Sequence, residues 1–175
     1  MYVLLGVVIL IGALVAYAST RPTDFRYVRV TTIQASPEQV FAQVNDFHRW
    51  EAWSPWAKLD PQMETTYSGA PAGHGAKYAW NSKSGKVGAG SMLITDAQAP
   101  RHVVIDLHFT RPFKAENVTR FTFEGAGGGT TVTWEMTGKN GLVSKIFGLF
   151  MNMDKLIGAD FDRGLASLKR VAEAS

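Results

Sequence analysis

The sequence contains no cysteine, which excludes disulfide bonds, thiolate zinc ligands and a cysteine nucleophile. It also lacks the H-E-x-x-H, G-x-S-x-G, P-loop and dinucleotide-binding motifs, and its glycine-rich stretches are better interpreted as hairpin turns. The four histidines form no pair at the helical spacing of a metal site. We therefore expect neither a metal nor a cofactor, and no catalytic motif stands out.

Clustered positive charge is a further feature that the chain lacks. The formal net charge is +3, and the lysines and arginines are scattered along the 175 residues. A nucleic-acid-binding protein usually gathers them in a patch or stripe, so we expect no nucleic acid as a partner. The hydrophobic content of 46% is ordinary for a globular protein, and the length suits one domain with a sizeable core.

Charged side chains are absent from residues 1–18, MYVLLGVVILIGALVAYA. This length is just sufficient for a helix that crosses a bilayer, and Tyr2 and Tyr17 lie near its ends, where aromatic belts form. The alternative is a cleaved signal peptide, because Ala16-Tyr17-Ala18 resembles a small-x-small cleavage site. A signal peptide usually begins with basic residues and has a shorter apolar segment, so the sequence favours a retained single-pass anchor.

The predicted organisation is an anchor at residues 1–19, a linker at residues 20–24 and one domain at residues 25–175. Basic residues follow the anchor, beginning with Arg21 and Arg26, whereas none precedes it. Because basic residues flank the cytoplasmic end of a membrane span, we expect the domain to lie on the cytoplasmic side of the membrane.

The domain begins with a predicted strand and a predicted helix. Residues 25–34, FRYVRVTTIQ, are rich in the β-branched and aromatic residues of strands. Ser36 is a good N-cap, Pro37 suits the first position of a helix, and Gln39 completes a capping box. From residue 62 to 139, apolar and polar residues alternate between turn signals, which predicts an antiparallel meander of about five or six strands with one apolar face.

Proline is absent from residues 142–172, where apolar residues recur at helical spacing. The pattern predicts one helix of about thirty residues that covers the sheet, with a bend or break near Gly148, Gly158 or Gly164. Within it, residues 142–153, LVSKIFGLFMNM, are apolar on most sides. They are either buried under the sheet or in contact with a membrane or a partner.

This order of elements resembles the helix-grip fold of the START-like, or SRPBCC, superfamily, an α+β fold whose curved antiparallel sheet wraps around a long C-terminal helix. The segment ASPEQVFAQVNDFHRWEAWSPWAKLDP is similar to the region near the start of polyketide cyclase/dehydrase-like members, and GKVGAGSMLI, GGGTTVTWEM and GADFDRGLASLK resemble their later strands and terminal helix. The resemblance covers about residues 26–171. It implies an apolar ligand cavity between sheet and helix, but it does not dictate the chemistry of the site.

The apolar inner face gives a set of candidate ligand contacts. Gly88 and Gly90 share the face of Met92, and their bare backbone favours open space there. The residues that we predict to bind the ligand are Trp53, Trp56, Tyr78, Trp80, Met92, Ile105, Phe109, Phe121, Trp134, Met153, Ile157 and Phe161.

Three tryptophans are gathered in HRWEAWSPWAKLD, residues 48–60, where the chain turns from helix into meander. Their spacing of three makes Trp50, Trp53 and Trp56 neighbours on a helical turn. Two interpretations follow. The cluster is either a structural plug that closes one end of the fold, or a wall in which Trp53 and Trp56 line the ligand entrance.

The sequence thus predicts membrane-tethered binding of a hydrophobic small molecule or lipid in an internal cavity, with no catalysis required. One alternative is a polyketide cyclase/dehydrase-like enzyme that uses a pocket carboxylate. Asp160 is the weak candidate for this role because it continues an apolar stripe, although it could equally be a surface residue or paired with Lys155 or Arg163. The second alternative is a protein-interaction or chaperone-activator-like module.

Overall fold

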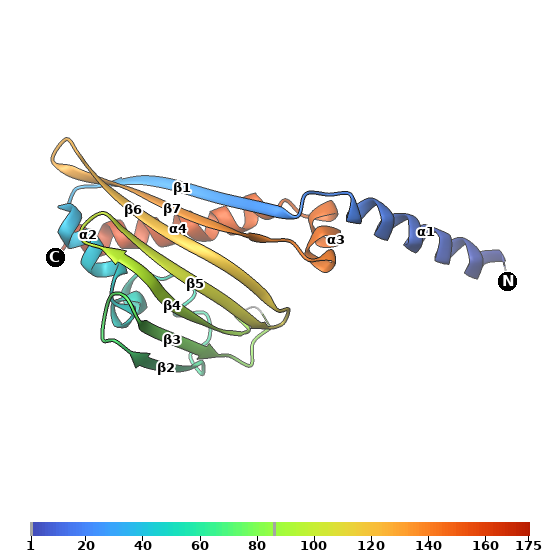
Figure 1. Ribbon diagram of the computed structural model, residues 1–175, viewed down its shortest axis with the longest axis horizontal. Coiled ribbons are helices and arrows are strands. Elements are labelled where there is room, and N and C mark those ends of the chain that lie inside the picture. Colours follow the sequence, from blue (N-terminus) through green and yellow to red (C-terminus); the bar gives the residue numbers. More distant parts are fainter. Residues whose placement is uncertain (1, 86) are drawn as a thin grey trace.

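The computed structural model describes residues 2–85 and 87–175. An apolar helix, α1 (Tyr2–Ser19), leads into a seven-stranded antiparallel sheet that curves around the C-terminal helix (Figure 1). The strand order is β1-β7-β6-β5-β4-β3-β2, so every strand after the first pairs with its neighbour in sequence and β1 pairs with β7. The predicted α+β fold with a curved antiparallel sheet is confirmed.

The longest strands are β6 and β7, and the shortest are β2 and β3 at one edge of the sheet. Their bounds are β1 (Asp24–Ile33), β2 (Glu64–Gly69), β3 (Ala76–Asn81), β4 (Ala89–Gln98), β5 (His102–Arg111), β6 (Ala115–Ala126) and β7 (Gly129–Lys139). Buried and exposed residues alternate along β6 and β7, as expected for a sheet with one wet face. The register sets Phe121 opposite Trp134 on the apolar side, which we call the inner face.

The predicted helix after β1 is present as α2 (Pro37–Val44), and its capping box is confirmed. The Ser36 hydroxyl accepts a hydrogen bond from the Gln39 amide, and the Gln39 side chain accepts one from the Ser36 amide at 3.0 Å. A 3-10 helix, η1 (Phe47–Ala52), follows and begins the tryptophan segment. α2 ends at Val44, so the buried side chain of Phe47 belongs to η1 and not to α2.

The C-terminal segment forms two helices rather than the predicted single one. These are α3 (Leu142–Phe150) and α4 (Met153–Glu173). The chain is extended at Met151, and the Asn152 side chain accepts a hydrogen bond from the Lys155 amide at 2.9 Å, which caps the start of α4. The break follows soon after Gly148, one of the three glycines at which the sequence predicted it.

Of the two C-terminal helices, α4 covers the sheet and packs against β1. None of the residues of α3 is buried, so the interpretation that residues 142–153 lie under the sheet is wrong. The break at Met151 directs α3 away from the sheet, and α3 packs instead against α1 at the end of the molecule from which α1 extends (Figure 1).

Candidate functional site

The centre of the molecule is filled by rings that the sequence assigned to a ligand site. Trp134 stacks on Phe161 of α4 with ring centroids 4.2 Å apart, and Phe121 lies 4.7 Å from Trp134. Trp53 and Trp56 both present an edge to Trp134, at 5.8 and 5.9 Å. Around Trp134, these side chains therefore fill the space between the sheet and α4.

The predicted ligand-binding residues separate into two groups by burial. Those that are fully packed into the core are Trp53, Ile105, Phe121, Trp134 and Phe161. Those that are half-buried are Trp56, Tyr78, Trp80, Met92, Phe109, Met153 and Ile157. Only the second group has apolar surface that a ligand could reach without displacing the core.

The tryptophan segment contributes chiefly to packing. The indole nitrogen of Trp50 donates to the Val44 carbonyl at 2.9 Å, and that of Trp53 donates to the Gln43 carbonyl at 3.1 Å. Both bonds tie the segment to the last turn of α2, as a structural plug requires. Trp56, by contrast, is half-buried and lies against Trp134 and Phe161.

Two buried polar atoms on the inner face have no hydrogen-bond partner within residues 2–85 and 87–175. They are the indole nitrogen of Trp134 and the amide oxygen of Asn117. Asn117 lies beside Gly138 and Leu107 in the sheet, on the same face as Trp134. An unsatisfied polar atom in the core costs stability, so these two sites stand out among otherwise apolar neighbours.

The open space expected over Gly90 is not present. A Cβ atom at Gly90 would meet the Trp80 ring at 2.6 Å, because Trp80 lies across the bare backbone of the neighbouring strand. The Trp80 ring also contacts Phe109 and Tyr78, at 5.5 and 6.0 Å. Burial raises the pKa of Tyr78 to about 12, so its phenol is neutral at physiological pH.

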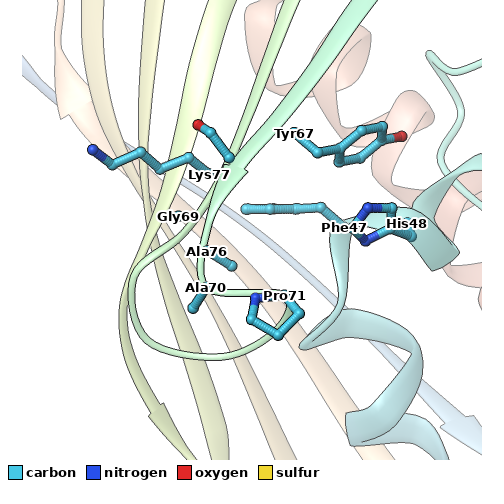
Figure 2. A pocket seen from close by; sticks show the side chains of 9 residues that line it. Phe47, His48, Tyr67, Gly69, Ala70, Pro71, Ala76 and Lys77 are labelled. Atoms are coloured by element: carbon cyan, nitrogen blue, oxygen red, sulfur yellow. The ribbon is translucent and has the colours of Figure 1, made fainter.

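A small hollow of about 170 Å³ lies between η1 and the β2–β3 hairpin. Figure 2 shows the rings of His48, Phe47 and Tyr67 on one side of it and the loop with Ala70 and Pro71 on the other. The His48 and Tyr67 rings stack at 4.2 Å, and the His48 ring also bonds Asp46 at 2.9 Å. None of the residues predicted to bind a ligand is among those described as lining this hollow.

A larger hollow of about 500 Å³ lies where α1 joins the domain, between the start of β1, α3 and the start of α4. Its lining is Arg21, Pro22, Asp24, Tyr27, Asn140, Ser144, Lys145, Gly148, Leu149, Phe150, Met151, Asn152 and Met153. Among the described residues, Met153 is the one predicted ligand contact that lines either hollow. We refer to this space as the junction hollow.

The junction hollow combines apolar and cationic side chains. Leu149, Phe150 and Met153 supply apolar surface, Arg21 and Lys145 supply positive charge, and Asp24 supplies one negative charge, so that cationic side chains outnumber the carboxylate. The Lys145 ammonium donates to the Thr23 hydroxyl at 3.0 Å, which joins α3 to the linker. Such a lining suits an amphipathic molecule with an anionic end.

Tyr27 connects the junction hollow with the inner face, because its partner on β7 is Met136. Burial raises the pKa of the Tyr27 phenol above its ordinary value, and the negative charge of Asp154 raises it further. Arg29 fixes the start of α4 beside β1 by donating to the Asp154 backbone oxygen at 3.0 Å and to its carboxylate at 3.2 Å. These bonds hold the start of α4, which lines one side of the hollow, against β1.

Asp160, the weak catalytic candidate, forms an ion pair with Arg163 one turn along α4. Pairing with Arg163 is one of the structural roles that the sequence left open for Asp160. Nowhere in residues 2–85 and 87–175 do three histidine, aspartate or glutamate side chains gather as they would around a metal ion.

The residues of the junction hollow that the sequence missed are chiefly Arg21, Tyr27 and Lys145. Their shared position arises from the contact between α3 and the linker, and Thr23 and Lys145 are 122 residues apart in the chain. The apolar character of residues 142–153 was the available signal, because it marked α3 as a surface in need of a neighbour.

The sequence profile of the family described as "Polyketide cyclase / dehydrase and lipid transport" matches residues 24–173. The chain therefore belongs to this family, which is SRPBCC-type, as its strands and terminal helix indicated. A search of curated proteins gave no significant match.

Solved structures share the fold at low sequence identity. Protein CV1439 from Chromobacterium violaceum is 15% identical, with a TM-score of 0.62 over 87% of this chain and 99% of that one. The Aha1 dimer from Colwellia psychrerythraea is 15% identical, with a TM-score of 0.60 over 85% of this chain and 96% of that one. DynU16, a protein of the dynemicin biosynthetic locus, is 16% identical, with a TM-score of 0.57 over 85% of this chain and 47% of that one. At these identities the likeness establishes the fold alone.

Proposed function

We propose that this protein is tethered to a membrane by α1 and binds a hydrophobic small molecule or lipid, without catalysis, in the junction hollow. The observation that carries the proposal is the position of this hollow of about 500 Å³ directly beside an apolar helix that is long enough to cross a bilayer. A volume of this size is ordinary for a small-molecule site. The family's description includes lipid transport, which supports the same class of ligand.

The apolar end of the ligand would lie against α4. Met153 lines the hollow, and Ile157, one turn further along α4, lies on the same side of the helix. Phe161 and Trp56 continue this apolar stripe, with their rings 6.4 Å apart. Met153, Ile157 and Trp56, three half-buried members of the predicted ligand site, are thus the proposed contacts, and Phe161 supports them from the core.

The polar end of the ligand would lie toward Arg21 and Lys145 at the linker. Tyr27 offers a neutral phenol that can donate a hydrogen bond, since burial raises its pKa above the ordinary tyrosine value, which already lies well above physiological pH. The proposal therefore favours fatty acids and related amphipathic acids over fully apolar molecules.

A photoactivatable fatty acid tests the proposal with the full chain in lipid nanodiscs. We expect cross-links to Leu149 and Met153, located by mass spectrometry. Ser144 lines the hollow and is exposed, so Ser144→Trp should fill the space and reduce cross-linking at Met153 at least about tenfold, equivalent to 1.4 kcal/mol of binding. Ser144→Ala is the matched control and should leave it unchanged. Cross-links confined to α1, or insensitive to Ser144→Trp, would contradict the proposal.

A further inference from the structure

An exposed apolar surface on α3 borders the junction hollow and shares Phe150 and Met151 with its lining. Its members, which we call the α3 patch, are Phe113, Val143, Phe147, Phe150 and Met151. Phe150 is 73% exposed and Phe113 is 55% exposed, although large aromatic side chains are rarely left in water without a reason. A contiguous group of such residues marks a surface that binds a partner or a membrane.

The α3 patch is one surface built from two separate segments. Val143, Phe147 and Phe150 recur at the spacing of one helix face. Phe113 comes from the turn between β5 and β6, and its ring lies 6.3 Å from that of Phe147. The turn and the helix therefore present their aromatic rings together.

The position of α3 identifies what covers this surface. α3 packs against α1, and Ala18, in the last turn of α1, is fully buried. If α1 spans the bilayer, its C-terminal end lies at the membrane surface, and α3 beside it lies at the depth of the lipid headgroups (Figure 1). No other occupant needs to be recruited, because the bilayer is already adjacent.

The charges around α3 fit the same setting. Lys145 is the one charged residue of α3, and Arg21 lies in the adjacent linker. Lys114 follows Phe113 directly, and Lys139 ends β7 just before α3. Basic residues that border an apolar helix face are typical of helices that lie in the interface of anionic membranes.

We propose that the α3 patch inserts into the boundary between headgroups and acyl chains of the bilayer that α1 spans, so that the junction hollow opens at the membrane surface. The inference rests on the proposed function in that it takes α1 as a retained span. It goes beyond that function by giving the folded domain a second membrane contact and a fixed orientation.

Fluorescent labels on single cysteines test this inference, because the chain has no cysteine of its own. Phe150→Cys and Phe113→Cys report on the α3 patch, Leu10→Cys reports on α1, and Thr66→Cys, exposed on β2, is the matched control. Each full-length variant carries an environment-sensitive dye in vesicles of phosphatidylcholine and phosphatidylserine that contain spin-labelled lipids. The spin label is placed either near the headgroup or deep in the acyl chain.

We expect the dyes at residues 150 and 113 to be blue-shifted and quenched most by the shallow spin label, and the dye at residue 10 to be quenched most by the deep one. Dyes at residues 150 and 113 that behave like the one at residue 66, while residue 10 remains quenched, would overturn the inference and leave the anchor intact. An unquenched dye at residue 10 would overturn the anchor and the inference with it. A blue shift without quenching, together with cross-linking between copies through residue 150, would instead assign the patch to a second copy of the chain.

Discussion

Trp53 and Trp56 stand three residues apart but have different surroundings. Trp53 is 1% exposed, and its indole nitrogen is bonded to the Gln43 carbonyl. Trp56 is half-buried, and its ring lies against those of Trp134 and Phe161. Trp53 therefore fits the interpretation of a structural plug, whereas Trp56 has exposed surface that a ligand could contact.

We predict that Trp53→Ala lowers the free energy of unfolding by about 3–5 kcal/mol, because it leaves a large cavity in the core and an unpaired Gln43 carbonyl. Trp56→Ala, the matched control in the same segment, should cost distinctly less, because part of its ring is already exposed. Urea denaturation followed by circular dichroism measures both. Equal losses for the two variants would show that Trp56 belongs to the plug as well.

Two glycines show how differently α3 and α4 are used. Gly164 of α4 lies against the sheet, where a Cβ atom would meet the Trp134 ring at 2.7 Å and Pro55 at 3.1 Å. Gly148 of α3 has no atom within 4 Å of the same position. Close packing of α4 on the Trp134 ring requires a glycine at position 164, whereas no described residue near α3 requires one at position 148.

Alanine substitution at these glycines should therefore have opposite effects. We predict that Gly164→Ala destabilises the domain by about 1–3 kcal/mol, because neither the Trp134 ring nor Pro55 can move without disturbing the core. Gly148→Ala should leave stability unchanged or raise it by up to about 1 kcal/mol, since alanine favours a helix more than glycine does. Thermal unfolding of both variants measures the difference. A destabilised Gly148→Ala variant would mean that α3 has a close neighbour at that position.

The elements themselves could largely be predicted from the sequence. The alternation around Phe121 and Trp134 placed both rings on the inner face, and the capping signal at Ser36 located the start of α2. From the sequence, the break at Met151 could be placed only near a glycine. Asn152 caps α4, but it is one of several asparagines in the chain, and the sequence does not show which of them caps a helix. Whether the inner face encloses a space could not be predicted, since this depends on how the Trp80 ring covers Gly90.

At the scale of the whole molecule, the junction hollow was beyond sequence reasoning. Tyr27, Lys145 and Met153 come from three elements whose meeting depends on the contact between α3 and α1. Periodicity describes which side of an element is apolar, but it does not state which distant element covers that side. The apolar helix α1, in contrast, is a local property of residues 1–18 and could be predicted directly, whereas its role as a membrane anchor stays a prediction.

The predicted orientation of the molecule can be measured with the Thr66→Cys variant. Arg21 and the basic residues after it should hold the domain on the cytoplasmic side. A membrane-impermeant maleimide should then label residue 66 in inverted membrane vesicles but not in intact expressing cells. Labelling from outside intact cells would reverse the orientation, and a mature N-terminus at Ser19 would show that α1 is removed as a signal sequence.

The pairing of β1 with β7 sets the order in which the chain can fold. Asp24 pairs with Lys139, so the nascent β1 has no neighbour in the sheet until β7 has left the ribosome. Such pairing over a long sequence separation also slows folding, because the intervening loop must close first. The first strand to be synthesised is thus among the last to be paired, and its edge stays unpaired until β7 has been translated.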